Sequence, residues 1–242
     1  MPFTFSHPAI VLPLSKVSRN WFSLTGLVIG SMTPDLEYPI REDSSTWVSH
    51  TLPGLFWFDL PLGLVLTFVF HDVIRNRLYD NLPIFLKRRV WPFRTFDWNA
   101  YCRQHWLLVI VSVFLGASSH LLWDGLTHHH GFFAGLFPVM VNGVSIMGTV
   151  LTWSRVLQHI STFIGGLVVI WAVASMPVVD VERHQNPKYW PLVFSIVAVL
   201  VVVRFSLGVG ENIVGEFMVT FIPSIVLALA ITPFLLTEKL NA

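Results

Sequence analysis

The sequence predicts an all-α polytopic membrane protein, and three observations lead to this fold class. Of the 242 residues, 54% are hydrophobic and only 12% are charged, whereas soluble domains average about 25% charged residues. The mean hydropathy is +0.65. Several stretches also reach the roughly twenty mostly apolar residues that a transmembrane helix needs. A net charge of +1 gives no reason to expect a nucleic-acid partner.

Five apolar stretches are predicted to be long transmembrane helices: 52–71, 105–126, 157–177, 190–209 and 213–236. A sixth stretch, 20–34, is shorter, and we expect it to cross the membrane only in part or to re-enter it. No stretch alternates between apolar and polar residues in the manner of a β-strand. We therefore expect a single membrane-embedded domain over residues 1–242.

Basic residues are concentrated in the connection 75–103, which contains seven of the 15 Lys and Arg residues. The connection 128–152, in contrast, contains no charged residue. Lys and Arg favour the cytoplasmic side of a membrane protein. We therefore expect 75–103 to face the cytoplasm and 128–152 to lie on the outer side.

The run SHLLWDGLTHHHG, residues 119–131, places ionisable side chains at the end of a predicted membrane helix. Such residues are costly in lipid and usually have a function there. His120 and Asp124 are four residues apart, so they share one face of the helix and can reach one ion. Of the three histidines that follow, His128 and His130 are candidate ligands. The alternative is that His120 and Asp124 only hydrogen-bond to each other and to a neighbouring helix.

Four further candidates stand at the same predicted ends of their segments: His7 in FTFSHP, Asp35 in GSMTPDLEY, His50 in WVSHTLPG and His159 in RVLQHIST. Imidazole and carboxylate without thiolate are the ligands of catalytic zinc and of manganese or iron sites. The single cysteine, Cys102, excludes a CxxC metal site. Carboxylates that are shared between ions suit a cluster of two or three metals. The sequence therefore predicts a centre of divalent metal ions, with zinc as the first choice and manganese or iron as alternatives.

The runs MPFTFSHPAIVLPL, LVIGSMTPDLEY, SHTLPGLFWFDLPLGL, GASSHLLWDGLTH and LQHISTFIGG together resemble the bacterial membrane family called domain of unknown function 4184, over nearly the whole chain. Their His and Asp pattern is similar to that of the inner-membrane metal-dependent hydrolases of the YdjM type. More distantly, it resembles the pattern of the zinc-dependent phospholipase C and P1 nuclease group. The resemblance implies a multi-pass protein of the bacterial inner (cytoplasmic) membrane with metal-dependent hydrolase activity.

The pattern of the phospholipase C and P1 nuclease group, carried onto this chain, implies seven metal ligands: His7, Asp35, His50, His120, Asp124, His130 and His159. That group has a glutamate four positions after the last histidine, where this chain has Phe163. Two metal ions are therefore expected, and a third would lack one of its ligands.

Two adjacent ions lower the pKa of a shared water and hold a substrate phosphate. Asp35 or Asp124 could accept a proton from that water, and Arg155 could hold a phosphoryl oxygen. Because a site at the ends of membrane helices meets lipid headgroups first, we expect hydrolysis of a phosphoester, either of a phospholipid or of a lipid phosphate, on the outer side. The sequence indicates the lipid bilayer as a partner and points to no protein partner.

Two alternatives stay open at this point: a metal-ion or proton transporter, and a non-catalytic membrane protein with a structural metal. Intramembrane His and Asp residues also mark ion pathways. Arg204 and Glu216 lie within the last two predicted helices, where charged side chains normally pair. They could form a structural ion pair or contact a substrate headgroup.

Overall fold

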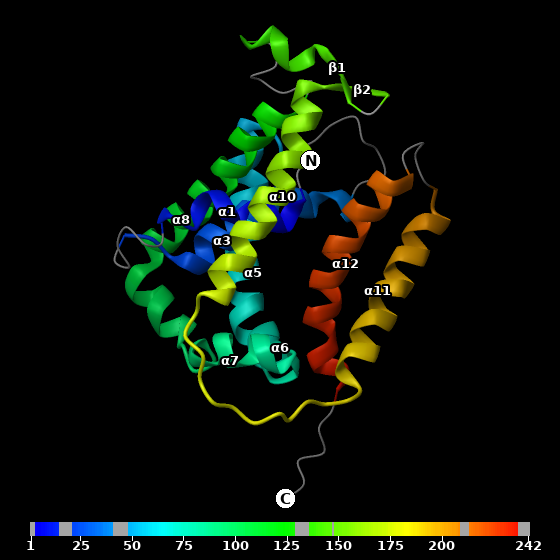
Figure 1. Cartoon of the computed structure of the whole chain (residues 1–242). Helices are drawn as coiled ribbons and strands as arrows, with labels where there is room; N and C mark the ends of the chain where they lie inside the picture. The colour runs from blue at the N-terminus through cyan, green and yellow to red at the C-terminus, as the bar shows by residue number, and fades with distance from the viewer. Residues whose placement is uncertain are drawn as a thin grey trace, which may run out of the picture. The chain divides into compact units, whose positions relative to one another are not determined.

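The computed structural model describes residues 3–14, 21–40, 48–128, 136–146, 148–208 and 213–236. This part of the chain is mainly helical, with a single short hairpin among the described residues, which confirms the predicted fold class (Figure 1). Five helices are long and apolar enough to cross a membrane: Leu52–Asn81, Trp98–Thr127, Trp153–Ala174, Tyr189–Ser206 and Gly215–Leu235. Each of them overlaps one of the five predicted stretches, as a multi-pass membrane protein requires.

In chain order, the helical elements are η1 (Thr4–Ser6), α1 (Pro8–Val11), α3 (Leu24–Met32), η2 (Thr33–Ile40), α4 (Leu52–Gly54), η3 (Leu55–Asp59), α5 (Leu60–Phe68), η4 (Val69–Ile74), α6 (Arg75–Asn81), α7 (Ile84–Val90), η5 (Trp91–Phe93), α8 (Trp98–Thr127), η6 (Pro138–Val141), α10 (Trp153–Ala174), α11 (Tyr189–Ser206) and α12 (Ile213–Leu235). The segments η3 and η4 are π-helical turns within the first long helix. The short sixth stretch, predicted at 20–34, corresponds to α3 and the beginning of η2.

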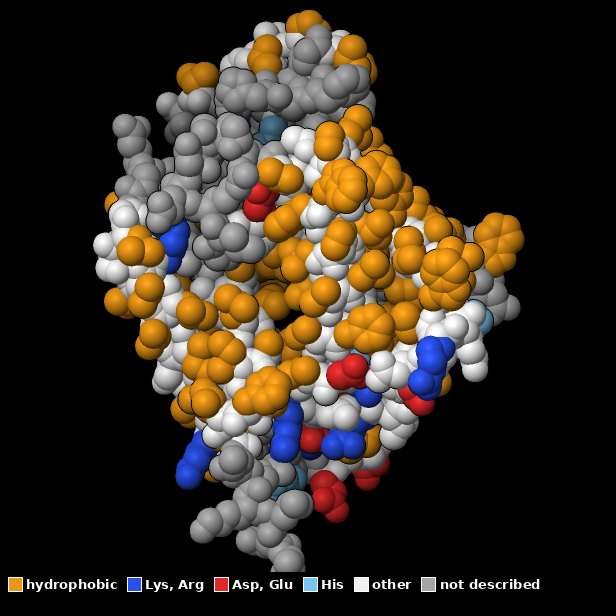
Figure 2. Space-filling model, turned by 180° about the vertical axis from the view of Figure 1, so that it is seen from behind, with side chains coloured by type: hydrophobic (Ala, Val, Ile, Leu, Met, Phe, Trp, Pro, Cys, Tyr) orange, Lys and Arg blue, Asp and Glu red, His pale blue; other side chains and the backbone are white. Residues whose placement is uncertain are grey.

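The surface agrees with a lipid environment. Hydrophobic side chains form a broad area of the described surface that Figure 2 shows. Large apolar side chains on the long helices are exposed, and Trp57 is 84% exposed. Water would disfavour such a surface, whereas the hydrocarbon core of a membrane accommodates it.

One feature was not predicted from the sequence, and another differs from the expectation. The polar connection 75–103 is largely helical, since α6, α7 and the first turns of α8 occupy it. Backbone hydrogen bonds hold a helix whether or not its side chains are apolar, so hydropathy does not mark where these helices end. In addition, β1 (Gly143–Ile146) and β2 (Thr149–Thr152) form an antiparallel hairpin, and the expectation of no strand is wrong there. The turn contains Gly148 with a φ of +83°, a conformation that glycine adopts readily.

The chain forms two compact units. The first consists of Met1–Pro34, Trp47–Leu64 and His105–Ala172, and the second of Asp35–Thr46, Val65–Gln104 and Val173–Ala242. The single domain expected over residues 1–242 stays a prediction.

In the first unit, α3 packs against α8 at glycines. A Cβ atom at Gly30 would collide with the carbonyl oxygen of Val113, and one at Gly116 would collide with the carbonyl oxygen of Leu27. Small residues allow the backbones of membrane helices to approach closely in this way. The close approach brings the C-terminal end of α3 against the part of α8 that carries His120.

The N-terminal segment is attached to α10 in the same unit. Phe3 donates its backbone N–H to Thr162 Oγ1 at 3.1 Å, and Ser6 Oγ donates to the Thr162 carbonyl at 2.8 Å. A Cβ at Gly165 would lie 2.8 Å from the Ser6 carbonyl oxygen, so only a glycine permits this contact without a shift. These contacts determine where His7, the next residue, lies relative to α10.

In the second unit, α11 packs against α12 around a small apolar core made by Tyr189, Val193, Val197 and Ala228. Arg204 Nη2 lies 3.5 Å from Glu216 Oε2. The two charges therefore form an ion pair between these helices, in agreement with the pairing expected for intramembrane charges.

Candidate metal centre

Asp124 lies in the last turn of α8, and its side chain is buried. His120 lies one turn earlier on the same face and is completely buried. The Nδ1 atom of His120 donates a hydrogen bond to the Ser31 carbonyl oxygen at 2.8 Å. This bond places the proton on Nδ1, because a carbonyl only accepts, and leaves Nε2 directed at Asp124 as a lone-pair donor.

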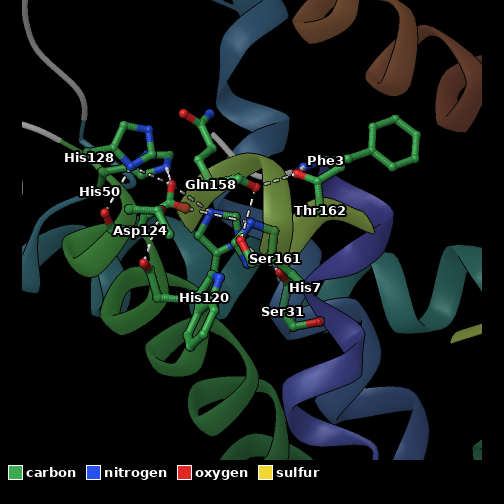
Figure 3. Close-up of polar contacts among 12 residues, drawn as sticks. Phe3, His7, Ser31, His50, His120, Asp124, His128, Gln158, Ser161 and Thr162 are labelled. Atoms are coloured by element: carbon green, nitrogen blue, oxygen red, sulfur yellow. Dashed lines mark hydrogen bonds and ion pairs between the residues drawn. The ribbon is translucent and has the colours of Figure 1, made fainter. Parts of the chain in front are cut away.

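Three imidazole Nε2 atoms surround the Asp124 carboxylate (Figure 3). The distances are 3.6 Å from His7 to Oδ1, 3.4 Å from His50 to Oδ2 and 3.5 Å from His120 to Oδ2. His128 approaches from the end of the helix, with its Nδ1 3.9 Å from Oδ2. His7, His50 and His120 therefore all direct Nε2 at the same carboxylate.

These distances fit a shared cation better than direct hydrogen bonds. An N–H···O bond usually spans about 2.7–3.2 Å, and the three Nε2 contacts at 3.4–3.6 Å are longer than that. Two ligand atoms that each lie about 2.0–2.2 Å from one tetrahedral ion are separated by roughly 3.3–3.6 Å. Among the described residues, no donor lies at ordinary hydrogen-bond distance from either carboxylate oxygen of Asp124. The donor set and its spacing could therefore hold a metal ion.

The Nδ1 atoms of His50 and His120 each have a polar partner, as metal-binding histidines require. His50 Nδ1 lies 2.9 Å from the hydroxyl of Ser49, just as His120 Nδ1 contacts Ser31. In metal sites, the nitrogen that does not bind the ion typically donates to such an acceptor, and this orients the ring. His50 itself stands before α4, where the Thr51 hydroxyl accepts the Gly54 N–H at 3.0 Å and begins the helix.

Asp35 and His7 complete the group. Asp35, directly after Pro34 in η2, is buried, and one ligand atom from each of Asp35, His50, His120 and Asp124 lies within 4.8 Å of the others. The His7 ring stacks on that of His120, with 3.7 Å between centroids and 18° between planes. We call His7, Asp35, His50, His120 and Asp124 the His–Asp group. All five had been predicted as ligands from the sequence.

The remaining predicted site residues fall into three cases. His128 Nδ1 donates to the Asp124 carbonyl oxygen at 2.9 Å, and burial lowers the pKa of this imidazole, although the Asp124 carboxylate opposes the shift. His130 lies outside the described residues. Arg155 and His159 lie on α10 with exposed side chains, and neither belongs to the His–Asp group. Their roles stay predictions.

Sequence reasoning missed the two residues that orient the histidines. Ser49 could have been noticed as a hydroxyl beside His50. The contribution of Ser31 comes from its backbone carbonyl, for which the side-chain pattern contains no signal.

Membrane-spanning helices and a buried group of histidines and aspartates define the class of this molecule: a polytopic membrane protein with a candidate metal centre. The chain belongs to the family described as domain of unknown function (DUF4184), whose family model matches residues 1–234. No curated protein and no solved structure matches it.

Proposed function

We propose that the protein is a membrane-bound, metal-dependent hydrolase that cleaves a phosphoester, with water as the nucleophile. The observation that carries the proposal is the buried Asp124 carboxylate with three histidine Nε2 atoms at 3.4–3.6 Å. Divalent ions held by imidazole and carboxylate supply a water of lowered pKa and neutralise the charge of a phosphate. Zinc is the first choice for this ligand set, with manganese or iron as alternatives.

The orientation of Asp124 supports two ions rather than one. Its Oδ1 faces His7, whereas its Oδ2 faces His50 and His120. A carboxylate that directs each oxygen at a different set of ligands has the geometry of a bridge between two ions. Such pairs of ions, about 3.5–4 Å apart, are common in phosphoesterases.

In this proposal, each residue of the His–Asp group has a task, and so does Arg155. His7, His50, His120 and Asp124 would hold the metal ions, which would supply a water of lowered pKa. Asp35, a buried carboxylate in the same group, accepts the proton of the attacking water. Arg155, exposed at the beginning of α10, contacts a phosphoryl oxygen of the part of the substrate that stays outside the group.

The membrane setting indicates the substrate class. The His–Asp group lies next to the end of α8, a helix of membrane-spanning length. The basic connection 75–103 and the uncharged connection 128–152 favour the outer side of the bacterial inner membrane for this end of α8. A site there meets the phosphates of lipid headgroups, so a phospholipid or a lipid phosphate is the proposed substrate.

The test combines metal analysis with a cleavage assay on the purified full-length protein. We expect about two zinc, manganese or iron ions per chain and cleavage of at least one member of a phosphomonoester and phosphodiester panel. Asp124→Ala should lose most of the metal and the activity, whereas Asp180→Ala, which removes an exposed carboxylate, should keep both. Metal content that is equal in wild type and Asp124→Ala would rule out the centre.

The same preparation distinguishes the hydrolase from a transporter. Reconstituted protein is assayed for phosphoester cleavage and for metal flux into vesicles. Flux without cleavage that also depends on Glu216 would contradict the hydrolase, because Glu216 pairs with Arg204 in the second unit and has no task in the cleavage reaction.

A further inference from the structure

A groove of about 320 Å³ begins at the His–Asp group and lies entirely within the first unit. His7 forms part of its wall, so the groove and the group share a residue. Most of the rest of the wall is apolar, and its larger side chains are Ile10, Trp123, Leu157, Ile160, Ile164 and Val168. Ligand pockets range from about 300 to 1,000 Å³, so this groove has room for a slender ligand only.

The wall on α10 is a continuous stripe. Leu157, Ile160, Ile164 and Val168 follow one another at intervals of three and four residues, which places them on one face of the helix. At 1.5 Å per residue, the stripe is about 16 Å long. This is about half of the roughly 30 Å hydrocarbon core of a bilayer. The stripe therefore matches the depth of one leaflet.

The serine hydroxyls that line the groove, Ser6 in the N-terminal segment and Ser161 on α10, are already hydrogen-bonded. Ser6 Oγ donates to the Thr162 carbonyl at 2.8 Å, and Ser161 Oγ donates to the Gln158 carbonyl at 3.0 Å. The contact between Ser6 and Gly165 holds the N-terminal segment against α10. These hydroxyl protons are consequently not directed into the groove, and its surface beyond His7 recognises a ligand by apolar contact.

The groove is open along its side. Ile160 and Ile164 line it and are still 49% and 54% exposed. Both residues lie on α10, a helix of membrane-spanning length. An acyl chain can therefore enter from the surrounding leaflet without first passing through water.

We infer that this groove holds one acyl chain of a bilayer phospholipid whose phosphate lies at the His–Asp group, so that the substrate is recognised by its chain as well as by its phosphate. The inference rests on the proposed function for the phosphate end, whereas the chain end rests on the groove itself. Each buried methylene contributes about 0.8 kcal/mol, or roughly fourfold in affinity. Blocking the space of two methylenes should therefore weaken chain binding by about fifteenfold.

The first experiment tests the chain independently of catalysis. Full-length protein is reconstituted in phosphatidylcholine vesicles that contain a small fraction of a phosphatidylcholine with a diazirine in one acyl chain. After irradiation, labelled peptides are mapped. We expect labelling to concentrate on Trp123, Ile160 and Ile164. In Val168→Phe the labelling of these residues should fall about fifteenfold. Ala9→Phe is a second variant, which narrows the groove from α1. Leu167→Phe, an exposed α10 position outside the groove, is the matched control and should label as wild type does.

Labelling that is spread equally over Leu167, Trp171 and the groove residues would mean that only bulk lipid surrounds α10, and would overturn the inference. The second experiment compares cleavage of long-chain phosphatidylcholine with cleavage of a chainless phosphodiester. Val168→Phe should lower the ratio of the two rates by tenfold or more, and Leu167→Phe should leave the ratio unchanged. An unchanged ratio in Val168→Phe also overturns the inference. If wild type cleaves neither substrate, the proposed function fails, and the labelling pattern still decides whether the groove holds a chain.

Discussion

Removing the hydroxyl of Ser49 should weaken metal binding without removing any ligand. In the structure this buried hydroxyl lies 2.9 Å from His50 Nδ1, while His50 Nε2 faces Asp124 at 3.4 Å. Ser49→Ala keeps the His50 imidazole but removes the hydroxyl that accepts its Nδ1 proton and orients the ring. Loss of such a supporting hydrogen bond typically lowers metal affinity about 10- to 100-fold, which corresponds to about 1.4–2.7 kcal/mol.

The affinity is measured by competition with a chromophoric zinc chelator on metal-stripped, full-length protein. Ser49→Thr, which keeps a hydroxyl, should restore most of the affinity. Ser195→Ala is the matched control, because the Ser195 hydroxyl is exposed and donates to the Pro191 carbonyl of its own helix at 2.8 Å. A zinc affinity of Ser49→Ala within twofold of the wild-type value would refute the orienting role of Ser49. If His50→Ala also kept that affinity, His50 would not be a ligand.

Three further predictions follow from the packing, the charge distribution and the ligand chemistry. Gly116→Val should lower the free energy of unfolding by about 1–3 kcal/mol in thermal unfolding and reduce the metal content, since a Cβ there collides with the Leu27 carbonyl. Gly166→Ala, where the nearest atom is 3.7 Å away, should change neither. A Gly116→Val variant that is as stable as wild type and fully metallated would contradict the packing. A cysteine at Asn142, in a Cys102→Ala background, should react with an impermeant thiol reagent in intact cells, and reaction at position 87 instead would invert the topology. Metal content should fall as the pH is lowered through the range in which imidazole gains its proton, because histidine ligands must be neutral; content that is independent of pH would exclude histidine ligation.

Much of the His–Asp group could be predicted because part of its geometry is local. The period of the α-helix alone places His120 and Asp124 on one face, and the structure confirms that both side chains point at the same group. The long helices were predictable for a similar reason, since the thickness of the bilayer determines how many consecutive apolar residues a span needs. The hairpin of β1 and β2 was missed because strands of four residues are too short to display a convincing alternation.

The sequence by itself determined that the chain crosses a membrane as helices and carries histidines and aspartates near their ends. It did not determine which of those side chains meet. His7 lies against His120 because Gly165 lets the N-terminal segment contact α10. His159, from the same predicted set, is exposed on α10. The packing of a helix against other helices sets its rotation about its own axis. Contacts between segments that are distant in the sequence therefore decide which helix face, and so which histidine, is directed at Asp124.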